Sequence, residues 1–513
     1  MKDILLCTLT GRYHHPSLGL RYLFANLSEF QAQTKICEYV IQKHPRDVVE
    51  DLLQYHPKIV GFGVYIWNAP QTLQVISILK RVAPEVTVVV GGPEVSFEIE
   101  TQEICQIADH VFKGESDISF YQFCKSFFEG HRPLNKIIQA DLPDVVTLKS
   151  PYPYYTDSDI KHRTIYVEAS RGCPFKCEYC LSSLDTAVRN FPTEQFLADI
   201  QALMDRGARQ FKFVDRTFNL SPTISTQILK FFLDRVDLGL FLHFELVPDR
   251  LPPELKELMS QFPAGSLQFE IGIQTWNPEV AKNVSRRQDY EKIKENFKYL
   301  REHTKVHTHA DLIFGLPGEN LESFASGFDQ LYKLEPDEIQ LGILKRLNGA
   351  PISRHMKTYE MAFMLEAPYQ ILKTKDIDFV TMQKFHRFSQ FWDQIANSGN
   401  FILTMKQLKI VAEEKFSGSL FWMFWSMTDF LTRRHGQSHS ISLISLLESV
   451  YYFLIDEVRL DKDQVRTLLA EDFCRHEKRD LPSFLKTQRR EIQSENGGRT
   501  KATPSRQRRH LRP

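Results

Sequence analysis

The sequence has no excess of charge of either sign: 64 Lys and Arg residues balance 64 Asp and Glu residues in a chain of 513. This balance gives no global electrostatic case for nucleic acid or an anionic membrane surface as a partner. No apolar run reaches the length of about 18 residues that a membrane-spanning helix needs. The start of the chain also lacks the long apolar segment and cleavage site of a secretory signal. These absences predict a cytoplasmic protein without a membrane partner.

Cysteine is scarce, with eight in the chain. Five of them, at positions 7, 37, 105, 124 and 474, show no framework spacing. A small secreted domain stapled by disulfides is therefore excluded, and a reducing compartment is expected.

The other three cysteines, Cys173, Cys177 and Cys180, form one Cys-x-x-x-Cys-x-x-Cys run. Thiolates are soft ligands that suit iron–sulfur clusters and zinc. Zinc would require a fourth ligand, and the nearest histidine, His162, precedes the run instead of completing it. Three ligands on a four-iron cluster would leave one iron open to a group that is not protein. A zinc site or three unrelated buried cysteines are the alternatives.

With Tyr179 as the aromatic residue before the last cysteine, this run resembles the signature of the radical SAM superfamily. The resemblance implies that Cys173, Cys177 and Cys180 hold a catalytic [4Fe–4S] cluster. It also implies that the open iron of that cluster binds S-adenosylmethionine (SAM).

The first 130 residues alternate apolar strand patterns with amphipathic helix patterns. Strands are predicted at 4–9, 34–40, 59–65, 86–90 and 110–113. Helices separate these strands, which indicates a parallel, Rossmann-like sheet covered on both faces. Ligands of such sheets bind beyond the carboxyl ends of the strands. Residues 131–163 are rich in proline and weakly periodic, and they are predicted to be a linker.

A second series of strands and helices covers 164–354. Its strands are predicted at 164–169, 210–214, 241–246, 266–272, 306–313 and 338–344. Six such units indicate a closed or partial (β/α)6 barrel with its chemistry at the carboxyl ends of the strands. The overall fold class is therefore α/β with a helical C-terminal region.

Residues 355–480 are predicted to be a mainly helical domain, which resembles an uncharacterised domain appended to such enzymes. Its aromatic-rich stretch, 411–434, could be a membrane or cofactor surface, but a buried helical core explains it better. Residues 481–513 are polar and basic and are predicted to be a disordered tail.

Polar residues at the ends of the barrel strands resemble motifs of radical SAM enzymes related to oxygen-independent coproporphyrinogen oxidase and the methylthiotransferases. The resemblance assigns Glu270 and Gln274 to the ribose or methionine part of SAM, and Arg286 or its neighbour Arg287 to the carboxylate. Gly315 and Gly318 would let the backbone approach the adenine. Taken singly, Glu270 could be a strand-end ion pair and the glycines a plain turn.

Asp215 and Arg216 stand where many radical SAM enzymes carry a Gly-Gly-Glu run. They are candidate SAM contacts, in a form that is familiar from the cobalamin-binding branch of the superfamily. This departure leaves open which group binds the SAM ammonium.

The N-terminal domain resembles the cobalamin-binding domain of that branch. The residues that carry the resemblance, and that are therefore candidate cobalamin contacts, are Tyr65, Trp67, Asn68, Gly91, Gly92, Pro93 and Glu94. The Asp-x-His-x-x-Gly run that supplies an axial histidine to cobalt in methionine synthase is absent, so we expect no histidine on the cobalt. A Rossmann-like domain that has lost the cofactor is the alternative.

Together these patterns predict a cobalamin-dependent radical SAM enzyme. The resemblance implies cleavage of SAM to a 5′-deoxyadenosyl radical, followed by methylation, cyclisation or rearrangement at an unactivated carbon. A small-molecule or peptide substrate and an external electron donor such as flavodoxin or ferredoxin are the expected partners. The rivals are a radical SAM oxidoreductase with an empty N-terminal domain and a non-catalytic iron–sulfur carrier or sensor.

Overall fold

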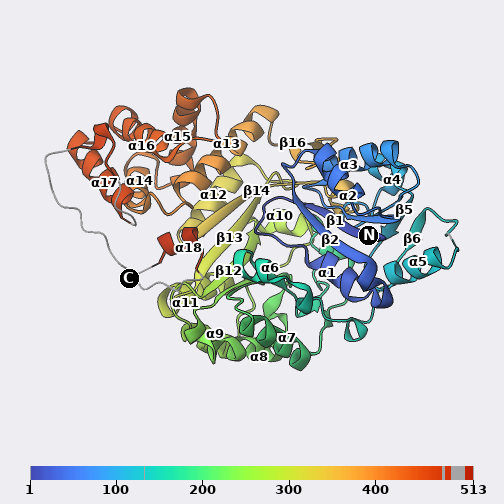
Figure 1. Ribbon diagram of the computed structural model, residues 1–513. Helices are drawn as coiled ribbons and strands as arrows, with labels where there is room; N and C mark the ends of the chain where they lie inside the picture. The colour runs from blue at the N-terminus through green and yellow to red at the C-terminus, as the bar shows by residue number, and fades with distance from the viewer. Residues whose placement is uncertain (1, 132, 476–479, 487–502, 512–513) are drawn as a thin grey trace. The chain divides into compact units, whose positions relative to one another are not determined.

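A computed structural model describes residues 2–131, 133–475, 480–486 and 503–511 (Figure 1). The chain divides into two compact units, of which the first comprises Met1–Arg216, Lys345–Arg354 and Phe363–Gln370. The second comprises Thr217–Leu344, His355–Ala362 and Ile371–Pro513. Among the described residues, no helix is both long and apolar enough to cross a membrane.

The first unit contains a parallel sheet in the order β2-β1-β3-β4-β5-β6. Its strands are β1 (Ile4–Thr10), β2 (Thr34–Val40), β3 (Ile59–Gly63), β4 (Thr87–Gly91), β5 (His110–Lys113) and β6 (Ile137–Gln139). Every residue of β1 is buried, as expected of a central strand that is covered on both faces.

Two hydrophobic cores lie on opposite faces of this sheet. One is formed with α2 (Pro45–Leu53), α3 (Ala69–Val82) and α4 (Glu103–Ile107). The other is formed with α1 (Leu18–Ala25) and α5 (Ser119–Phe128). Figure 1 shows α3 and α4 on one side of the strands and α1 and α5 on the other. The predicted Rossmann-like domain is thus confirmed.

The predicted linker at 131–163 is a folded part of the first unit instead. It adds β6 to the sheet and forms α6 (Asp157–His162), which begins with a capping box between Thr156 and Asp159. Asp159 is also part of a buried ion network, since the guanidinium of Arg21 lies 2.9 Å from its carboxylate. Because the partners of this segment are far away in the sequence, its local pattern gave no sign of order.

The six strands of the second series are all present, and the pairs that they form within each unit are parallel. β7 (Ile165–Val167) pairs with β10 (Gln210–Phe213) in the first unit. In the second unit, neighbours pair in chain order along β11 (Phe241–Leu246), β12 (Leu267–Gln274), β13 (His307–Phe314) and β14 (Glu338–Ile343). The helices of this series are α7 (Thr193–Asp205), α8 (Pro222–Leu233), α9 (Pro253–Ser260), α10 (Pro278–Asn283), α11 (Tyr290–His303) and α12 (Leu321–Tyr332).

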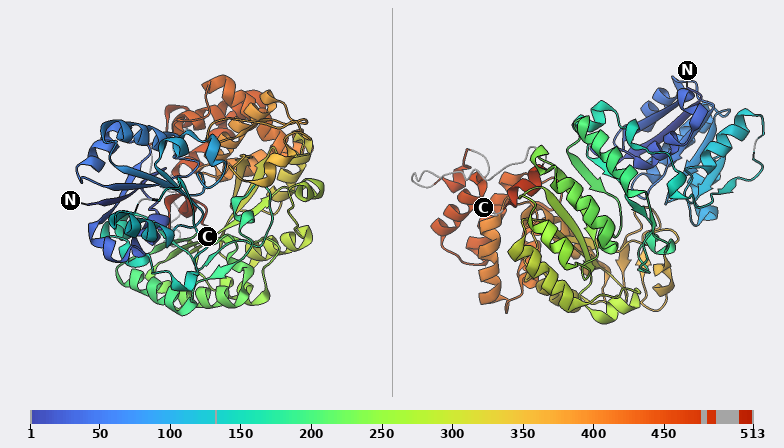
Figure 2. Two further views of the ribbon diagram at one scale, coloured as in Figure 1. Left: turned by 90° about the vertical axis from the view of Figure 1, so that its right-hand side faces the viewer. Right: turned by 90° about the horizontal axis from the view of Figure 1, so that it is seen from below.

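The C-terminal region of the second unit is helical, as predicted. It comprises α13 (Phe379–Ile395), α14 (Ile402–Lys415), α15 (Leu420–His435), α16 (Leu443–Tyr452), a π-helical turn (Phe453–Glu457) and α17 (Lys462–Cys474). Figure 2 shows these helices, in orange to red, gathered together. Two short strands, β15 (Ala362–Phe363) and β16 (Ile371–Lys373), precede them.

The aromatic side chains of this region form a core. Phe388 and Trp392 of α13 contact Phe421 and Phe424 of α15, and all four are at most 2% exposed. The interpretation of the aromatic stretch as buried is therefore confirmed. The stretch 411–434 is not one continuous helix, because Ser417 and Gly418 both have positive φ and separate α14 from α15.

Part of the tail that was predicted to be disordered is ordered. Residues 503–511 contain α18 (Ser505–Arg509), and Arg506 lies 2.7 Å from the buried carboxylate of Glu338, the first residue of β14. Thr503 donates a 2.6 Å hydrogen bond to the carbonyl of Gly265. Arg506 of the tail pairs with Glu338 and Asp393, which lie far away in the sequence. The sequence of the tail alone gives no sign of these partners. Residues 487–502 lie outside the described part of the chain.

Candidate functional site

The three clustered cysteines lie on a loop that is closed at its base. The antiparallel pair β8 (Ser170–Arg171) and β9 (Arg189–Asn190) joins the two ends of the loop. Gly172 has φ +91°, and a Cβ there would lie 2.2 Å from the carbonyl oxygen of Ala187, so only glycine fits. The amide of Cys173 donates a 3.0 Å hydrogen bond to the carbonyl of Asp185. The loop is thereby held in a defined shape.

The three cysteines are not joined in disulfide bonds. Cys177 is 8% exposed, and Cys173 and Cys180 are half-buried. Burial raises the pKa of Cys173, and the neighbouring Cys180 and Cys177 thiols raise it further, whereas Arg216 lowers it. Cys173 therefore lies close to the other two thiols. The loop therefore fits the cluster as its three-thiolate ligand.

Among the described residues, no group of three or more His, Cys, Asp or Glu side chains could hold a single metal ion. This finding does not bear on a cluster, because three thiolates on a four-iron cluster bind three different irons and need not converge on one atom.

The base of the cysteine loop is anchored by a buried charge network. The guanidinium of Arg171 lies 2.8 Å from Glu115, 2.9 Å from Asp117 and 2.9 Å from Glu168. Burial alone would lower the pKa of Arg171, but the charges of Glu168 and Asp117 outweigh it and the pKa is raised. Glu115 and Asp117 follow β5, so the network ties the loop to the N-terminal sheet domain.

Sequence reasoning missed this anchor. No sequence pattern assigned a role to Glu115 or Arg171. Two of the three partners of Arg171, Glu115 and Asp117, lie more than fifty residues away in the sequence.

Asp215, a predicted SAM contact, has a carboxylate that is bound by protein partners. It is 2% exposed, and its carboxylate accepts hydrogen bonds from the Ala169 amide (3.0 Å) and the Ser170 hydroxyl (2.6 Å). Burial raises its pKa to about 7. Asp215 thus holds the strand that leads into the cysteine loop. Arg216, in contrast, is exposed and close enough to influence Cys173, and it stays a candidate SAM contact.

In the second unit, three residues that are predicted to contact SAM lie on β12 or donate to its backbone. Glu270 is 25% exposed at its side chain and lies 3.0 Å from His243 of β11. Gln274 has φ +70° at a bulge where the β12–β13 register shifts. Arg286 donates to the carbonyl of Gly272, directly before this bulge. Arg287 is exposed, so Arg286 is the arginine that belongs to this group.

The two glycines after β13 are required by contacts within the second unit. Gly315 has φ +91°, and a Cβ there would lie 2.8 Å from Ile371. Gly318 has φ +85°, and a Cβ would lie 2.9 Å from the side chain of Asn283. These contacts account for glycine at both positions, and an adenine contact stays a prediction.

Glu319 directly follows Gly318 and carries a buried carboxyl group whose pKa is raised. It is 1% exposed and accepts 2.8 Å hydrogen bonds from Thr275 and Ser323. Burial raises its pKa from 4.5 to about 7. Because the folded-state pKa is raised, the stability that this group contributes is present below about pH 4.5 and is lost as the pH rises through 7.

We therefore expect Glu319→Gln to flatten the pH dependence of stability. Relative to the wild type, the variant should gain at most about 3 kcal/mol between pH 4.5 and pH 8, since one pKa unit corresponds to about 1.4 kcal/mol. Urea denaturation at both pH values measures this difference. Glu322→Gln, which changes an exposed carboxylate of α12, is the control and should leave the pH profile unchanged.

Three of the predicted cobalamin residues have roles within the protein. Asn68 is fully buried, donates to Thr8 (3.2 Å) and to the Leu9 carbonyl (2.9 Å), and accepts from the Tyr65 amide (2.8 Å). Gly92 has φ +114°, and a Cβ there would lie 2.5 Å from the carbonyl oxygen of Val64. The two residues shape the loops that follow β3 and β4.

Glu94 is the third of these residues. It is 3% exposed, and its carboxylate accepts hydrogen bonds from Tyr369 (2.7 Å) and Asn348 (3.0 Å). Its side chain is therefore committed to protein partners instead of being open to a ligand.

The remaining cobalamin candidates are accessible. Trp67 is 52% exposed and stacks on Tyr65, with ring centroids 4.5 Å apart and planes 8° from parallel. Gly91 ends β4, and Pro93 is exposed. A rigid, open aromatic pair at the carboxyl end of a parallel sheet suits the planar surface of a corrinoid.

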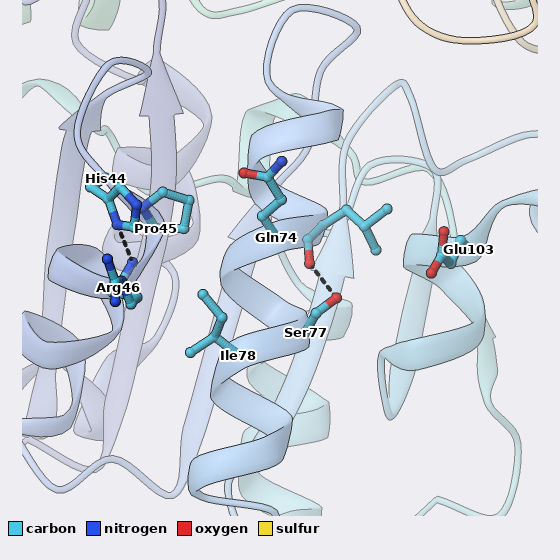
Figure 3. A pocket seen from close by; sticks show the side chains of 8 residues that line it. His44, Pro45, Arg46, Gln74, Ser77, Ile78 and Glu103 are labelled. Carbon is cyan, nitrogen blue, oxygen red and sulfur yellow. Dashed lines mark hydrogen bonds between the residues drawn. The ribbon is translucent and has the colours of Figure 1, made fainter.

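A groove of about 570 Å³ lies elsewhere on the N-terminal domain (Figure 3). It is lined by His44 and Arg46 at the start of α2, by Gln74 and Ile78 of α3, and by Glu103 of α4. The groove lies among helices that cover the sheet, and none of the predicted cofactor residues lines it.

Three models of known protein families match three successive segments of the chain. The model of the B12 binding domain matches residues 5–123, and that of the radical SAM superfamily matches residues 167–331. The chain therefore contains a radical SAM domain preceded by a B12 binding domain. A third model, of a protein family of unknown function (DUF4080), matches residues 357–509, including the ordered helix α18.

Two curated relatives illustrate the similarity. An uncharacterized methyltransferase of Pyrococcus horikoshii is 25% identical over 360 residues, which are 64% of this chain and 75% of that protein. The cobalamin-dependent radical SAM methyltransferase TokK of Streptomyces tokunonensis is 21% identical over 56% of this chain, and the match spans about half of TokK (47%).

Solved structures show the same fold at low sequence identity. The cobalamin-dependent SAM radical enzyme OxsB, with aqua-cobalamin and SAM bound, has a TM-score of 0.58 at 13% identity and covers 92% of this chain and 83% of its own. The methyltransferase TsrM of Kitasatospora setae, with cobalamin and a [4Fe–4S] cluster bound, has a TM-score of 0.55 at 16% identity, covering 69% and 74%.

The cofactors of this radical SAM enzyme follow from its domains. The radical SAM domain brings a [4Fe–4S] cluster and SAM, and the B12 binding domain brings cobalamin. Cys173, Cys177 and Cys180 are the residues that fit the cluster.

Proposed function

We propose that this protein is a cobalamin-dependent radical SAM methyltransferase. The observation that carries the proposal is that the N-terminal domain and the cysteine loop belong to one compact unit, joined by Arg171. A methyl donor and a radical source must act on the same substrate atom, so their binding sites have to be held together. The relatives named as methyltransferases favour methyl transfer over cyclisation or rearrangement.

The candidate site residues have separate roles. Cys173, Cys177 and Cys180 hold the cluster, and Tyr65 with Trp67 offers a platform for the corrinoid. Glu270, Gln274 and Arg286 bind the polar groups of SAM, as do Arg216 and the backbone at Gly315 and Gly318. When bound, the cluster with SAM supplies a radical and the corrinoid supplies a methyl group. The protein orients these groups and keeps water away from them.

The partners follow from this chemistry. The substrate is a small molecule or a peptide with an unactivated carbon. An external one-electron donor of the flavodoxin or ferredoxin type reduces the cluster.

The proposal is tested by purifying the full chain without oxygen in the presence of hydroxocobalamin. We expect a bound corrinoid spectrum together with iron–sulfur absorption, and SAM cleavage under dithionite. The electron paramagnetic resonance (EPR) spectrum of the cob(II)alamin form should lack the nitrogen splitting of an axial imidazole. Iron–sulfur absorption without corrinoid would instead support an empty N-terminal domain. Failure to cleave SAM would support a non-catalytic iron–sulfur protein.

Trp67→Ala should weaken the binding of hydroxocobalamin by about 3- to 10-fold, because a stacked aromatic contact contributes about 0.5–1.5 kcal/mol. Equilibrium dialysis of the full chain measures the dissociation constant. Phe379→Ala is the matched control, since Phe379 of α13 is 51% exposed and Trp67 is 52% exposed. Equal affinities of the two variants would remove Trp67 from the corrinoid site.

A further inference from the structure

A segment that follows the barrel strands in sequence returns to the first unit. This segment, Arg346–Arg354, is called the strap here. It belongs to the same compact unit as the N-terminal domain and the cysteine loop. Each end of the strap contacts a different one of these two elements.

The first half of the strap is fixed to Glu98, which lies in the loop after β4. The guanidinium of Arg346 donates to both carboxylate oxygens of Glu98, at 2.8 and 3.0 Å, in a bidentate pair. The amide of Gly349 donates to the same carboxylate at 3.3 Å. Gly349 has φ +84°, and a Cβ there would lie 2.3 Å from the ring of Phe97. The strap therefore packs closely on this loop.

A second contact holds the same half of the strap. Asn348 is 3% exposed and donates to Glu94, which also accepts from Tyr369. Glu94 and Glu98 flank the loop after β4, so this loop and the strap form one packed body.

The second half of the strap is fixed to Glu178, which lies between Cys177 and Cys180. The amide of Ile352 donates a 2.9 Å hydrogen bond to the backbone carbonyl of Glu178. Arg354 pairs with the Glu178 carboxylate, whose side chain is only 3% exposed. The turn between the second and third cysteines is thus held at both its backbone and its side chain.

The two anchor points are close together along the strap. Ile352 is the third residue after Gly349, and an extended chain advances at most about 3.5 Å per residue. The attachment to the loop after β4 and the attachment to the cysteine turn therefore lie within about 11 Å of each other. The strap bridges the predicted corrinoid loop and the cluster loop over a short distance.

We propose that the strap is a positioning element that fixes the Cys177–Cys180 turn against the B12-domain loop Gly92–Glu98, with Arg354 as its positioning residue at the cluster end. The inference rests on the proposed function in one respect, which is that the Gly92–Glu98 loop serves a bound corrinoid. A displacement of about 1 Å between reacting groups can reduce a rate by about 100-fold, so a short rigid link between two cofactor loops has a direct effect on rate.

The test uses the reconstituted full chain and two readouts: the rate of SAM cleavage under dithionite and the change in the EPR signal of the reduced cluster when SAM is added. We expect Arg354→Gln to retain its iron, because the three cysteines are unchanged and Arg354 itself is 61% exposed at its side chain. SAM cleavage should fall by about 10- to 100-fold, with an altered EPR signal. Arg354→Lys should restore most of both.

Glu98→Gln tests the far end of the strap. Glu98 contacts neither a cysteine nor the turn between Cys177 and Cys180. Glu98→Gln should nevertheless slow SAM cleavage and alter the EPR signal in the same direction as Arg354→Gln. The double variant Glu98→Gln with Arg354→Gln should be no slower than the slower single variant, because both changes release the same link.

Arg433→Gln is the matched control, since Arg433 of α15 forms an exposed ion pair with Glu457. The proposal is overturned if Arg354→Gln behaves like this control in both readouts. It is also overturned if Glu98→Gln changes neither readout, or if the double variant is slowed by the product of the two single factors. A wild-type chain that binds no corrinoid contradicts the proposed function instead, and the cluster EPR signal still tests the strap.

Discussion

Replacing Cys177 by alanine should abolish the iron–sulfur absorption of the purified chain and its cleavage of SAM. Cys177 is the most buried of the three clustered thiols, at 8% exposed, and no other cysteine lies in the loop to replace it. A cluster with two protein ligands would lose iron, and without the cluster the reduction of SAM has no electron path. We expect the rate of SAM cleavage to fall by about 1,000-fold or more, a loss comparable to that of removing a catalytic residue.

Cys37→Ala is the control for this experiment, because Cys37 of β2 is buried to a similar degree, at 6% exposed, and lies outside the loop. Iron and sulfide analysis of both variants after anaerobic reconstitution gives the measurement. If Cys177→Ala kept full iron content and SAM cleavage, the assignment of the cluster to this loop would be wrong.

Many strands of both sheets could be predicted from the sequence because they are buried. Parallel strands that are covered on both faces appear as short, continuous apolar runs between helical patterns. The predicted range 241–246 coincides with the mostly buried β11, and the ranges 34–40 and 110–113 coincide with β2 and β5, which are only partly buried. Each of these strands is defined by its own local pattern, which needs no knowledge of distant partners.

The connections could not be predicted, because long-range ion pairs and hydrogen bonds order them. Arg21 and Asp159 are 138 residues apart, and Asn348 and Glu94 are 254 residues apart. Neither pair leaves a periodic signal in the sequence. The predicted linker at 131–163, the tail at 503–511 and the strap all depend on such partners, so local composition was a poor guide to their order.

The candidate site was predicted in part. The cysteine run stood out because its spacing has no structural explanation, and the loop geometry fits it. Asp215, Asn68 and Glu94 also belong to the resembling motifs, but their polar atoms are occupied by protein partners. Residues can carry a family resemblance because they shape the loops around a cofactor, and a motif alone does not separate that role from direct binding.

Replacing Arg171 by methionine should destabilise the first unit by about 3–5 kcal/mol, the loss expected when one partner of a buried ion network is removed. The side chain of Arg171 is 13% exposed, and it neutralises Glu115, Asp117 and Glu168. Methionine keeps much of the apolar contact with Tyr22, over which the guanidinium lies at 4.6 Å. The loss would therefore report mainly on Asp117 and Glu168, because Glu115 keeps its ion pair with Arg189. Chemical denaturation followed by tyrosine and tryptophan fluorescence measures it.

Two comparisons make this prediction specific. Arg433→Met removes an exposed ion pair and should cost at most about 1 kcal/mol. Arg171→Lys should recover only part of the loss, because an ammonium cannot reach three carboxylates with the fixed fork of a guanidinium. In Arg171→Met the unpaired carboxylates have raised pKa values in the folded state, so its deficit relative to the wild type should shrink as the pH falls from 8 to 5. A deficit that does not change with pH would mean that Arg171 acts through packing on Tyr22 and not through its charge.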